Sequence, residues 1–253
     1  MKLGFGNLAV TADMVAFDKD GTLIAFHELW HAWMDRFIQA IGEQILFTPA
    51  IDNAFACILG WNPDTGIWDP LGPATLASTQ EVALLASAVL YGYASVDWPR
   101  AQAVVKQAYD NVWTHLPVEE LVKPTGDVNS LLIALREGGI RTALVTADDR
   151  QPTIETLERF GWDSLFDLVL CGDDGLPQKP DPALLLEACR RLEISPERTI
   201  MVGDTVADLA MARQAGAALV VAVLGGSMPA ELLAPRADVV LTSIDEITVI
   251  REE

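Results

Sequence analysis

From about residue 119 onward, the sequence alternates between short apolar runs and helix-length segments, and this alternation constrains the fold more than any other feature. The apolar runs are aliphatic or β-branched and lie at 140–145, 168–170, 199–202, 219–223 and 239–241. The helix-like segments lie at 127–137, 152–160, 182–191 and 206–214. Continuous apolar strands that alternate with helices are typical of a mostly parallel sheet covered on both faces. The pattern therefore predicts an α/β fold with a doubly wound, Rossmann-like sheet.

Turn and capping residues support these boundaries. Glycines follow three of the helix-like segments, where helix C-caps belong, at Gly138–Gly139, Gly161 and Gly216. Asp181 followed by Pro182 is the pattern of an N-cap with proline at the first helical position. Ligands of parallel α/β sheets bind beyond the carboxyl ends of the strands, so we expect the functional residues directly after the apolar runs.

Residues 26–118 follow a different pattern. They contain amphipathic segments of helix length at 27–41, 80–93 and 100–112 and no convincing series of strands. We interpret this stretch as an all-helical cap domain, 26–118, inserted after the first strand of an α/β core domain formed by 1–25 and 119–253. Its tryptophans, mostly at helical spacing, are expected to form the core of the cap. His27 and His31 share a helix face, but without a carboxylate pattern such as His-Glu-x-x-His they do not indicate a metal site.

The chain is strongly acidic, with 36 Asp and Glu residues against 17 Lys and Arg residues and a formal net charge of −19. A field of this sign repels phosphate backbones and argues against nucleic acid as a partner. The three cysteines, without Cys-x-x-Cys spacing, indicate neither disulfides nor a zinc site. The most apolar stretch, 215–224, is about half as long as a membrane span, and no signal peptide is evident. We therefore expect a soluble cytoplasmic protein without a membrane partner, and leave open whether it is a monomer or a homodimer.

Acidic residues, a threonine and a lysine occupy the predicted functional edge. The first strand, 14–17, runs directly into Asp18-Lys19-Asp20-Gly21-Thr22. On an extended chain residues two apart face the same side, so Asp18 and Asp20 can address one ligand while Lys19 points elsewhere. The later parts of the chain add Thr146 after an apolar run, Lys179 in a loop before a helix, and Asp204 with Asp208, four residues apart at a helix start.

Carboxylates that converge at one edge need a counter-charge. Two unit charges about 4 Å apart repel by roughly 4 kcal/mol at an effective dielectric of 20. Either some of these carboxylates stay protonated or a cation sits among them. Because the ligands on offer are oxygen atoms, the set favours Mg²⁺ over zinc or copper. With Mg²⁺ and Lys179 in place, the pocket can accept a phosphate group despite the negative charge around it.

Four sequence motifs resemble those of a known family. In order, they are FDKDGTL, the threonine of LVTAD, the lysine of QKPDP and GDTVAD. They resemble the four motifs of the haloacid dehalogenase superfamily, and the resemblance spans the whole chain. It is strongest to the phosphoglycolate-phosphatase-like hydrolases, which carry a helical cap between the first two motifs. The stretch 59–66 also resembles a loop found in some of these phosphatases.

The resemblance implies a phosphatase mechanism with an aspartyl-phosphate intermediate. Asp18 would attack phosphorus, and Asp20 would protonate the leaving alcohol and then take a proton from the hydrolytic water. Thr146 and Lys179 would hold the non-bridging phosphate oxygens. Mg²⁺ would be held by Asp18, the backbone carbonyl of Asp20, and Asp204, with Asp208 bound directly or through water. The implied substrate is a small phosphorylated metabolite, with phosphoglycolate as the family-level expectation.

Charged and polar neighbours of these residues are interpreted as structural. We expect Lys19 to be solvated and Thr22 to steady its loop by hydrogen bonding. The acids at Asp148–Asp149 and Asp173–Asp174 are expected to be loop and capping residues.

Two rival functions remain at this point. A phosphomutase of the same superfamily would also keep Asp20, and would differ only in whether water or a sugar hydroxyl receives the phosphoryl group. A non-catalytic phosphoacceptor, such as a receiver-type signalling module, also combines an aspartate, a hydroxyl and a lysine on a doubly wound sheet. Receivers are about half as long and lack the helical insertion, which favours the phosphatase. A haloacid dehalogenase is disfavoured because that branch lacks an acid at the position of Asp20.

Overall fold

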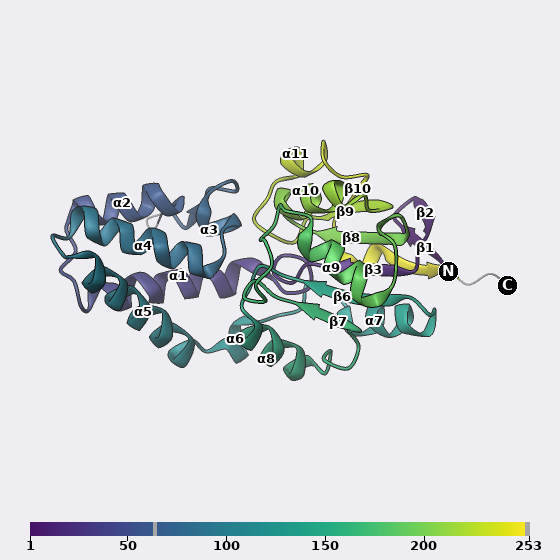
Figure 1. The fold of residues 1–253 in the computed structure, drawn as a ribbon, viewed down its shortest axis with the longest axis horizontal. Helices are drawn as coiled ribbons and strands as arrows, with labels where there is room; N and C mark the ends of the chain where they lie inside the picture. Colours follow the sequence, from purple (N-terminus) through teal and green to yellow (C-terminus); the bar gives the residue numbers. More distant parts are fainter. Residues whose placement is uncertain (63–64, 251–253) are drawn as a thin grey trace. The chain divides into compact units, whose positions relative to one another are not determined.

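The structure is a computed structural model, and it describes residues 1–62 and 65–250 (Figure 1). The chain divides into two compact units by its internal contacts. One unit comprises Met1–Phe26 together with the chain from Lys123 onward, and the other comprises His27–Val122. The junctions therefore follow Phe26 and Val122, close to the helix that begins at Phe26 and the short helix that ends at Leu121.

A six-stranded parallel sheet forms the centre of the first unit, with strand order β10-β9-β8-β3-β6-β7. Its strands are β3 (Met14–Phe17), β6 (Arg141–Val145), β7 (Leu168–Leu170), β8 (Thr199–Gly203), β9 (Leu219–Val223) and β10 (Val239–Leu241). Every residue of β3, β8 and β9 is buried. Because successive side chains of a strand point to opposite faces, both faces of the sheet must be covered. The predicted doubly wound α/β fold is confirmed.

Helices connect these strands at the predicted places, with ends that differ from the prediction by at most two residues. They are α7 (Val128–Glu137), α8 (Arg150–Phe160), α9 (Ala183–Leu192) and α10 (Val206–Ala215), with the shorter η1 (Pro196–Arg198), α11 (Ala230–Leu233) and η2 (Ile244–Glu246). Gly161 and Gly216 adopt the left-handed conformation that ends α8 and α10, at φ 69° and 79°. The Asp181 carboxylate accepts a hydrogen bond from the Ala183 backbone at 2.9 Å, but the N-cap position of α9 is held by Pro182 and not, as predicted, by Asp181.

A second, antiparallel sheet joins the two ends of the chain, and sequence analysis did not predict it. Its order is β11-β1-β2, formed by β1 (Lys2–Phe5), β2 (Leu8–Thr11) and β11 (Ile247–Ile250). Leu3 and Phe5 of β1 are fully buried. The sheet therefore adds buried apolar side chains to the first unit. It does so by pairing β1 with β11, a strand far away in the sequence.

The second unit is mainly helical. Its helices are α1 (Phe26–Gly42), α2 (Pro49–Leu59), α3 (Pro73–Leu76), α4 (Thr79–Tyr93), α5 (Trp98–His115) and α6 (Val118–Leu121). Aromatic side chains pack between them: Trp33 stacks on Phe37 with ring centroids 4.8 Å apart, and Trp33 is 1% exposed. The prediction of an apolar tryptophan core therefore holds for Trp33.

The expectation that this unit is all-helical was wrong. It contains a short antiparallel hairpin of β4 (Trp61–Asn62) and β5 (Ile67–Trp68), in which Trp61 lies opposite Trp68. Gly60 ends α2 in the left-handed conformation at φ 71°, which lets the chain leave the helix and begin the hairpin. Both tryptophans are buried, so the hairpin is held by packing rather than by strand length. The stretch 59–66, noted for its resemblance to a phosphatase loop, includes residues 63 and 64, which lie outside the described residues.

Within the described part of the chain, no helix combines the length and the apolar character needed to cross a membrane.

Candidate active site

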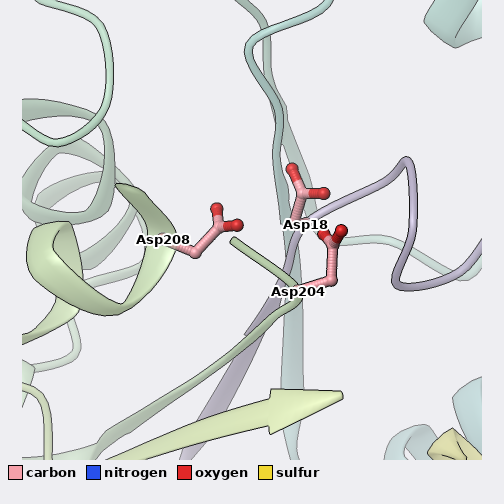
Figure 2. A group of neighbouring side chains, drawn as sticks. All are labelled: Asp18, Asp204 and Asp208. Carbon is pink, nitrogen blue, oxygen red and sulfur yellow. The ribbon is translucent and has the colours of Figure 1, made fainter. Parts of the chain in front are cut away.

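Three aspartates from separate elements meet at the carboxyl end of the parallel sheet (Figure 2). Asp18 follows the central strand β3, and its backbone N–H donates to the Val202 carbonyl of the neighbouring β8 at 2.9 Å. Asp204 directly follows β8, and Asp208 lies in the first turn of α10. One carboxylate oxygen from each lies within 4.8 Å of the others, and all three residues are buried. The parallel order of β3 and β8 brings together acids that are 186 residues apart in sequence (18 to 204).

Lys179 lies between two of these acids. Its ammonium is 2.5 Å from Oδ1 of Asp18 and 2.5 Å from Oδ1 of Asp208, and its side chain is 5% exposed. Burial works to lower the pKa of Lys179, but the neighbouring carboxylates Asp18 and Asp208 outweigh it and the pKa is raised. The site therefore holds one permanent positive charge against three acidic groups.

The remaining negative charge of the site contributes to raising the pKa values of its carboxyl groups. Burial, with repulsion from Asp208 and Asp20, raises the pKa of Asp18 to about 7 even though Lys179 opposes the shift. Burial first, then the charges of Asp18 and Asp208, raise the pKa of Asp204 well above its ordinary value. Either protons or a cation must balance this group of acids.

One oxygen of this group is poised for a ligand. Oδ1 of Asp204 accepts a hydrogen bond from the Thr22 hydroxyl at 3.3 Å, whereas Oδ2 is buried and has no hydrogen-bond partner among the residues that the structure describes. A buried carboxylate oxygen without a partner is costly, and a hard divalent cation is the ligand that such oxygens prefer. The donor set of Asp18, Asp204 and Asp208 consists of oxygen atoms, which fits Mg²⁺.

Thr146 and Asp20 lie at the same edge of the sheet but outside the group of three acids. Thr146 directly follows β6, whose Leu144 is in register with Phe17 of β3, and it is buried. Its hydroxyl accepts a hydrogen bond from the Asp148 backbone at 3.1 Å. The Asp20 side chain is 12% exposed, and its Oδ2 lies 2.7 Å from the ammonium of Lys19.

This arrangement of strand-end residues matches a known family. A family model described as hydrolase, haloacid dehalogenase-like hydrolase, matches residues 12–216 of the chain. The chain belongs to the haloacid dehalogenase-like hydrolases. The matched range contains all the strand-end residues named above and the whole of the second unit.

Known proteins similar to this haloacid dehalogenase-like hydrolase include two curated relatives and one solved structure. The phosphoglycolate phosphatase of Nitrosospira multiformis is 33% identical over 149 residues, which cover 59% of this chain and 63% of that protein. The pyrophosphatase PpaX of Halalkalibacterium halodurans is 35% identical over 102 residues, which cover 40% of this chain and 47% of that protein. The crystal structure of a predicted phosphoglycolate phosphatase from Haemophilus somnus has a TM-score of 0.70 at 18% identity and covers 92% of this chain and 95% of that chain. The matched segments span less than two thirds of either curated relative, and the solved structure supports the fold.

Asp208 of this hydrolase faces a different group with each carboxylate oxygen. Oδ2 accepts hydrogen bonds from the Thr205 hydroxyl at 2.6 Å and the Thr205 backbone at 3.1 Å, forming the capping box of α10. Oδ1 faces Lys179. The helix cap therefore fixes the position of Asp208, and Asp208 in turn faces the lysine.

Glycines surround the Asp204 carboxylate, and of these only Gly21 lies within one of the four sequence motifs. A side chain at Gly21, which has φ 81°, or at Gly226 would overlap the carboxylate of Asp204. A side chain at Gly225 would overlap the backbone carbonyl of Gly21. The loop after β9 must therefore carry glycines for the backbone to approach Asp204 this closely. The position of Gly225–Gly226 directly after the apolar run 219–224 was the available signal.

The expectation that Lys19 is solvated was wrong. Its side chain is 3% exposed, and its ammonium lies 2.7 Å from Oδ2 of Asp20 and 3.0 Å from Oδ2 of Asp148. The prediction assumed an extended chain through Asp20, but the chain already turns at Lys19, whose carbonyl accepts hydrogen bonds from Leu23 at 2.8 Å and Ile24 at 3.0 Å. Asp148 lies in the loop after β6, as expected, and is buried there.

The raised pKa of Asp18 predicts how stability depends on pH without a divalent ion. The unfolded carboxyl loses its proton near its ordinary pKa of 3.8, whereas the folded one keeps it until about pH 7. Between these values the unfolded state is the one that ionises, so the free energy of unfolding falls as pH rises, by up to about 4 kcal/mol for this group. Mg²⁺ binds the ionised form and is expected to raise the melting temperature more at pH 8 than at pH 5.

Thermal unfolding in EDTA and in MgCl₂ at the two pH values measures this effect. Asp204→Asn is expected to reduce both the pH dependence and the Mg²⁺ shift. Asp163→Asn, which removes one exposed acid elsewhere in the same unit, serves as the matched control and should change neither. Equal stability of the metal-free protein at both pH values would contradict the charge balance described here.

Proposed function

We propose that this haloacid dehalogenase-like hydrolase is a Mg²⁺-dependent phosphatase that hydrolyses a small phosphorylated metabolite through an aspartyl-phosphate on Asp18. The observation that carries the proposal is the buried carboxylate of Asp18, which lies beside the ammonium of Lys179 and within 4.8 Å of two further acids. A nucleophile, a cation for the phosphate oxygens and an oxygen-ligand set for a divalent ion therefore come together at one strand end.

The first half of the proposed reaction transfers the phosphoryl group to the protein. An oxygen of Asp18 bonds to phosphorus while the bond from phosphorus to the leaving oxygen breaks. Asp20 donates a proton to that leaving oxygen, and the alcohol departs. Lys179 and the hydroxyl of Thr146 bind the non-bridging oxygens, and the raised pKa of Lys179 in the free protein means that a charged ammonium meets the substrate.

The second half returns the protein to its starting state. Asp20, now a carboxylate, takes a proton from a water molecule whose oxygen bonds to phosphorus. The bond between phosphorus and Asp18 breaks, and inorganic phosphate leaves. The Asp18 carboxylate is thereby restored.

The residues that would hold Mg²⁺ are Asp18, Asp204 and the backbone carbonyl of Asp20, with Asp208 acting through Lys179. A bound Mg²⁺ would supply positive charge to the ionised acids and to the incoming phosphate. The unpartnered Oδ2 of Asp204 supports this assignment.

The names of the two similar enzymes, a phosphoglycolate phosphatase and a pyrophosphatase, guide the substrate proposal. Phosphoglycolate and pyrophosphate are both small, strongly anionic phosphate compounds. We therefore expect a substrate of this size and charge, with phosphoglycolate as the first candidate.

A panel of phosphorylated metabolites with released inorganic phosphate as the readout tests the proposal. We expect many turnovers on one small phosphate ester, loss of activity in EDTA, and recovery with Mg²⁺. Rescue by zinc alone would contradict the oxygen-ligand argument. Interconversion of sugar phosphates without phosphate release would favour the phosphomutase, and a single phosphorylation without turnover would favour the phosphoacceptor.

A further inference from the structure

We infer that Lys19 and Asp148 form a buried positioning pair that fixes the carboxylate of Asp20, so that its Oδ1 is the oxygen that transfers the proton. This inference rests on the proposed phosphatase function and adds two residues to it. Lys19 and Asp148 touch neither phosphate nor nucleophile in this role; they act through Asp20.

The contacts that define the pair are short and buried. The ammonium of Lys19 is 2.7 Å from Oδ2 of Asp20 and 3.0 Å from Oδ2 of Asp148. The side chains of Lys19 and Asp148 are 3% and 4% exposed. Burial works to lower the pKa of Lys19, but Asp20 and Asp148 outweigh it and the pKa is raised, so the lysine is charged where it lies.

Stability alone does not account for such a group. Removing two acids and a lysine from water costs as much as their mutual attraction returns, so apolar side chains of similar size would stabilise the fold at least as well. A buried ion pair fixes a geometry, however, because each charge holds its neighbour in one position. Lys19, next to the nucleophile, therefore fixes the position of the Asp20 carboxylate, which an apolar side chain could not do.

Asp148 anchors the pair to the strand that carries Thr146. Its backbone N–H donates to the Thr146 hydroxyl at 3.1 Å, and its Oδ1 accepts a hydrogen bond from the Asp149 backbone at 2.9 Å. Lys19 thus connects the loop after β3 to the loop after the neighbouring strand β6. Lys19 and Asp148 therefore fix the proposed proton donor, Asp20, relative to the proposed phosphate-binding hydroxyl of Thr146.

The two carboxylate oxygens of Asp20 differ in whether they have a bonding partner. Oδ2 is bound to Lys19, whereas Oδ1 is buried and has no hydrogen-bond partner in the described part of the chain. Because no protein donor occupies Oδ1, it is the oxygen of Asp20 that can bond to a reacting group once substrate binding opens a path to it. Because proton transfer requires hydrogen-bond distance, a shift of about 1 Å in this oxygen is enough to lower the rate by about 10²-fold.

Leaving-group chemistry separates this role from a purely structural one. A poor leaving group such as an alkoxide must be protonated as it departs, whereas 4-nitrophenolate departs without help from an acid. The ratio kcat/KM reports the step that forms the phosphoenzyme, in which the leaving group departs. Lys19→Met, which keeps the unbranched apolar stem and removes the charge, is expected to lower kcat/KM by about 100-fold for an alkyl phosphate and by about threefold for 4-nitrophenyl phosphate.

Two further variants keep the experiment decisive. Arg150→Met removes another partly buried ion pair of the same unit, the one with Asp174. It should change kcat/KM by the same factor for both substrates. If Lys19→Met fails to fold because Asp148 is left as an unpaired buried charge, the double variant Lys19→Met with Asp148→Asn removes both charges and should show the same selective loss. Melting temperatures of all variants are measured beside the kinetics.

Each outcome decides one proposal. If Lys19→Met lowers kcat/KM at least about tenfold more for the alkyl phosphate than for 4-nitrophenyl phosphate, the positioning pair is supported. Equal losses for both substrates, or no loss, overturn it while leaving the phosphatase proposal intact, since the wild-type protein still turns over. Wild-type protein that hydrolyses neither phosphate overturns the phosphatase proposal and the positioning pair together.

Discussion

Replacing Asp18 with asparagine is expected to lower the rate of phosphate release by at least about 10⁴-fold, because an amide oxygen cannot serve as the nucleophile. The change removes one acid from a buried group of three, next to Lys179. Its effect on folding should therefore be small or stabilising in the absence of metal, since burial disfavours the ionised form of Asp18. Steady-state kinetics on the best substrate of the panel, with thermal unfolding alongside, measures both effects.

Asp163→Asn is the matched control for this experiment, because it makes the same chemical change at an exposed position of the same unit. It should retain full activity. Retained turnover by Asp18→Asn would instead show that another group attacks phosphorus.

Replacing Asp20 with asparagine is expected to lower turnover by about 10²- to 10⁴-fold, the range attributed to a general acid–base group. Asparagine keeps an oxygen that can accept the hydrogen bond from Lys19, so the loop should hold its shape while proton transfer is lost. With 4-nitrophenyl phosphate, formation of the phosphoenzyme should continue and its hydrolysis should stall. Rapid-mixing kinetics should therefore reveal a burst of about one 4-nitrophenolate for each active site.

Asp18→Asn is the reference for the burst experiment, because it should give no burst at all. An unchanged steady-state rate in Asp20→Asn would remove the acid–base role. Slow turnover of Asp20→Asn without a burst would mean that Asp20 acts only in the formation of the phosphoenzyme.

The features predicted from the sequence are those with local signals. Apolar runs, capping glycines and the Asp-Pro pair at 181–182 mark the strands and helices of the parallel sheet within about two residues. The convergence of Asp18 with Asp204 follows from a general property of parallel sheets, whose strand ends lie at one edge, and not from their separation in sequence. Motif spacing and topology were therefore sufficient for the main part of the candidate site.

The features that were missed depend on contacts between distant residues. The β1 strand pairs with β11, so nothing near residue 3 signals that Leu3 has a partner at Val249. The hairpin of β4 and β5 has two residues in each strand, too few for a periodic pattern. Lys19 is buried and paired with Asp148 from the loop after the neighbouring strand β6, whereas a lysine in a loop is ordinarily exposed.

The central claim is that Asp18 carries the phosphoryl group, and trapping the intermediate tests it most directly. The protein, mixed with its substrate and Mg²⁺, is quenched in acid during turnover and reduced with borohydride, which converts an aspartyl-phosphate to homoserine. Peptide mass spectrometry then locates the modified residue. We predict homoserine at position 18 in wild-type protein and a larger trapped fraction in Asp20→Asn. Modification at another aspartate, or phosphate release with no modified residue in either protein, would contradict the mechanism.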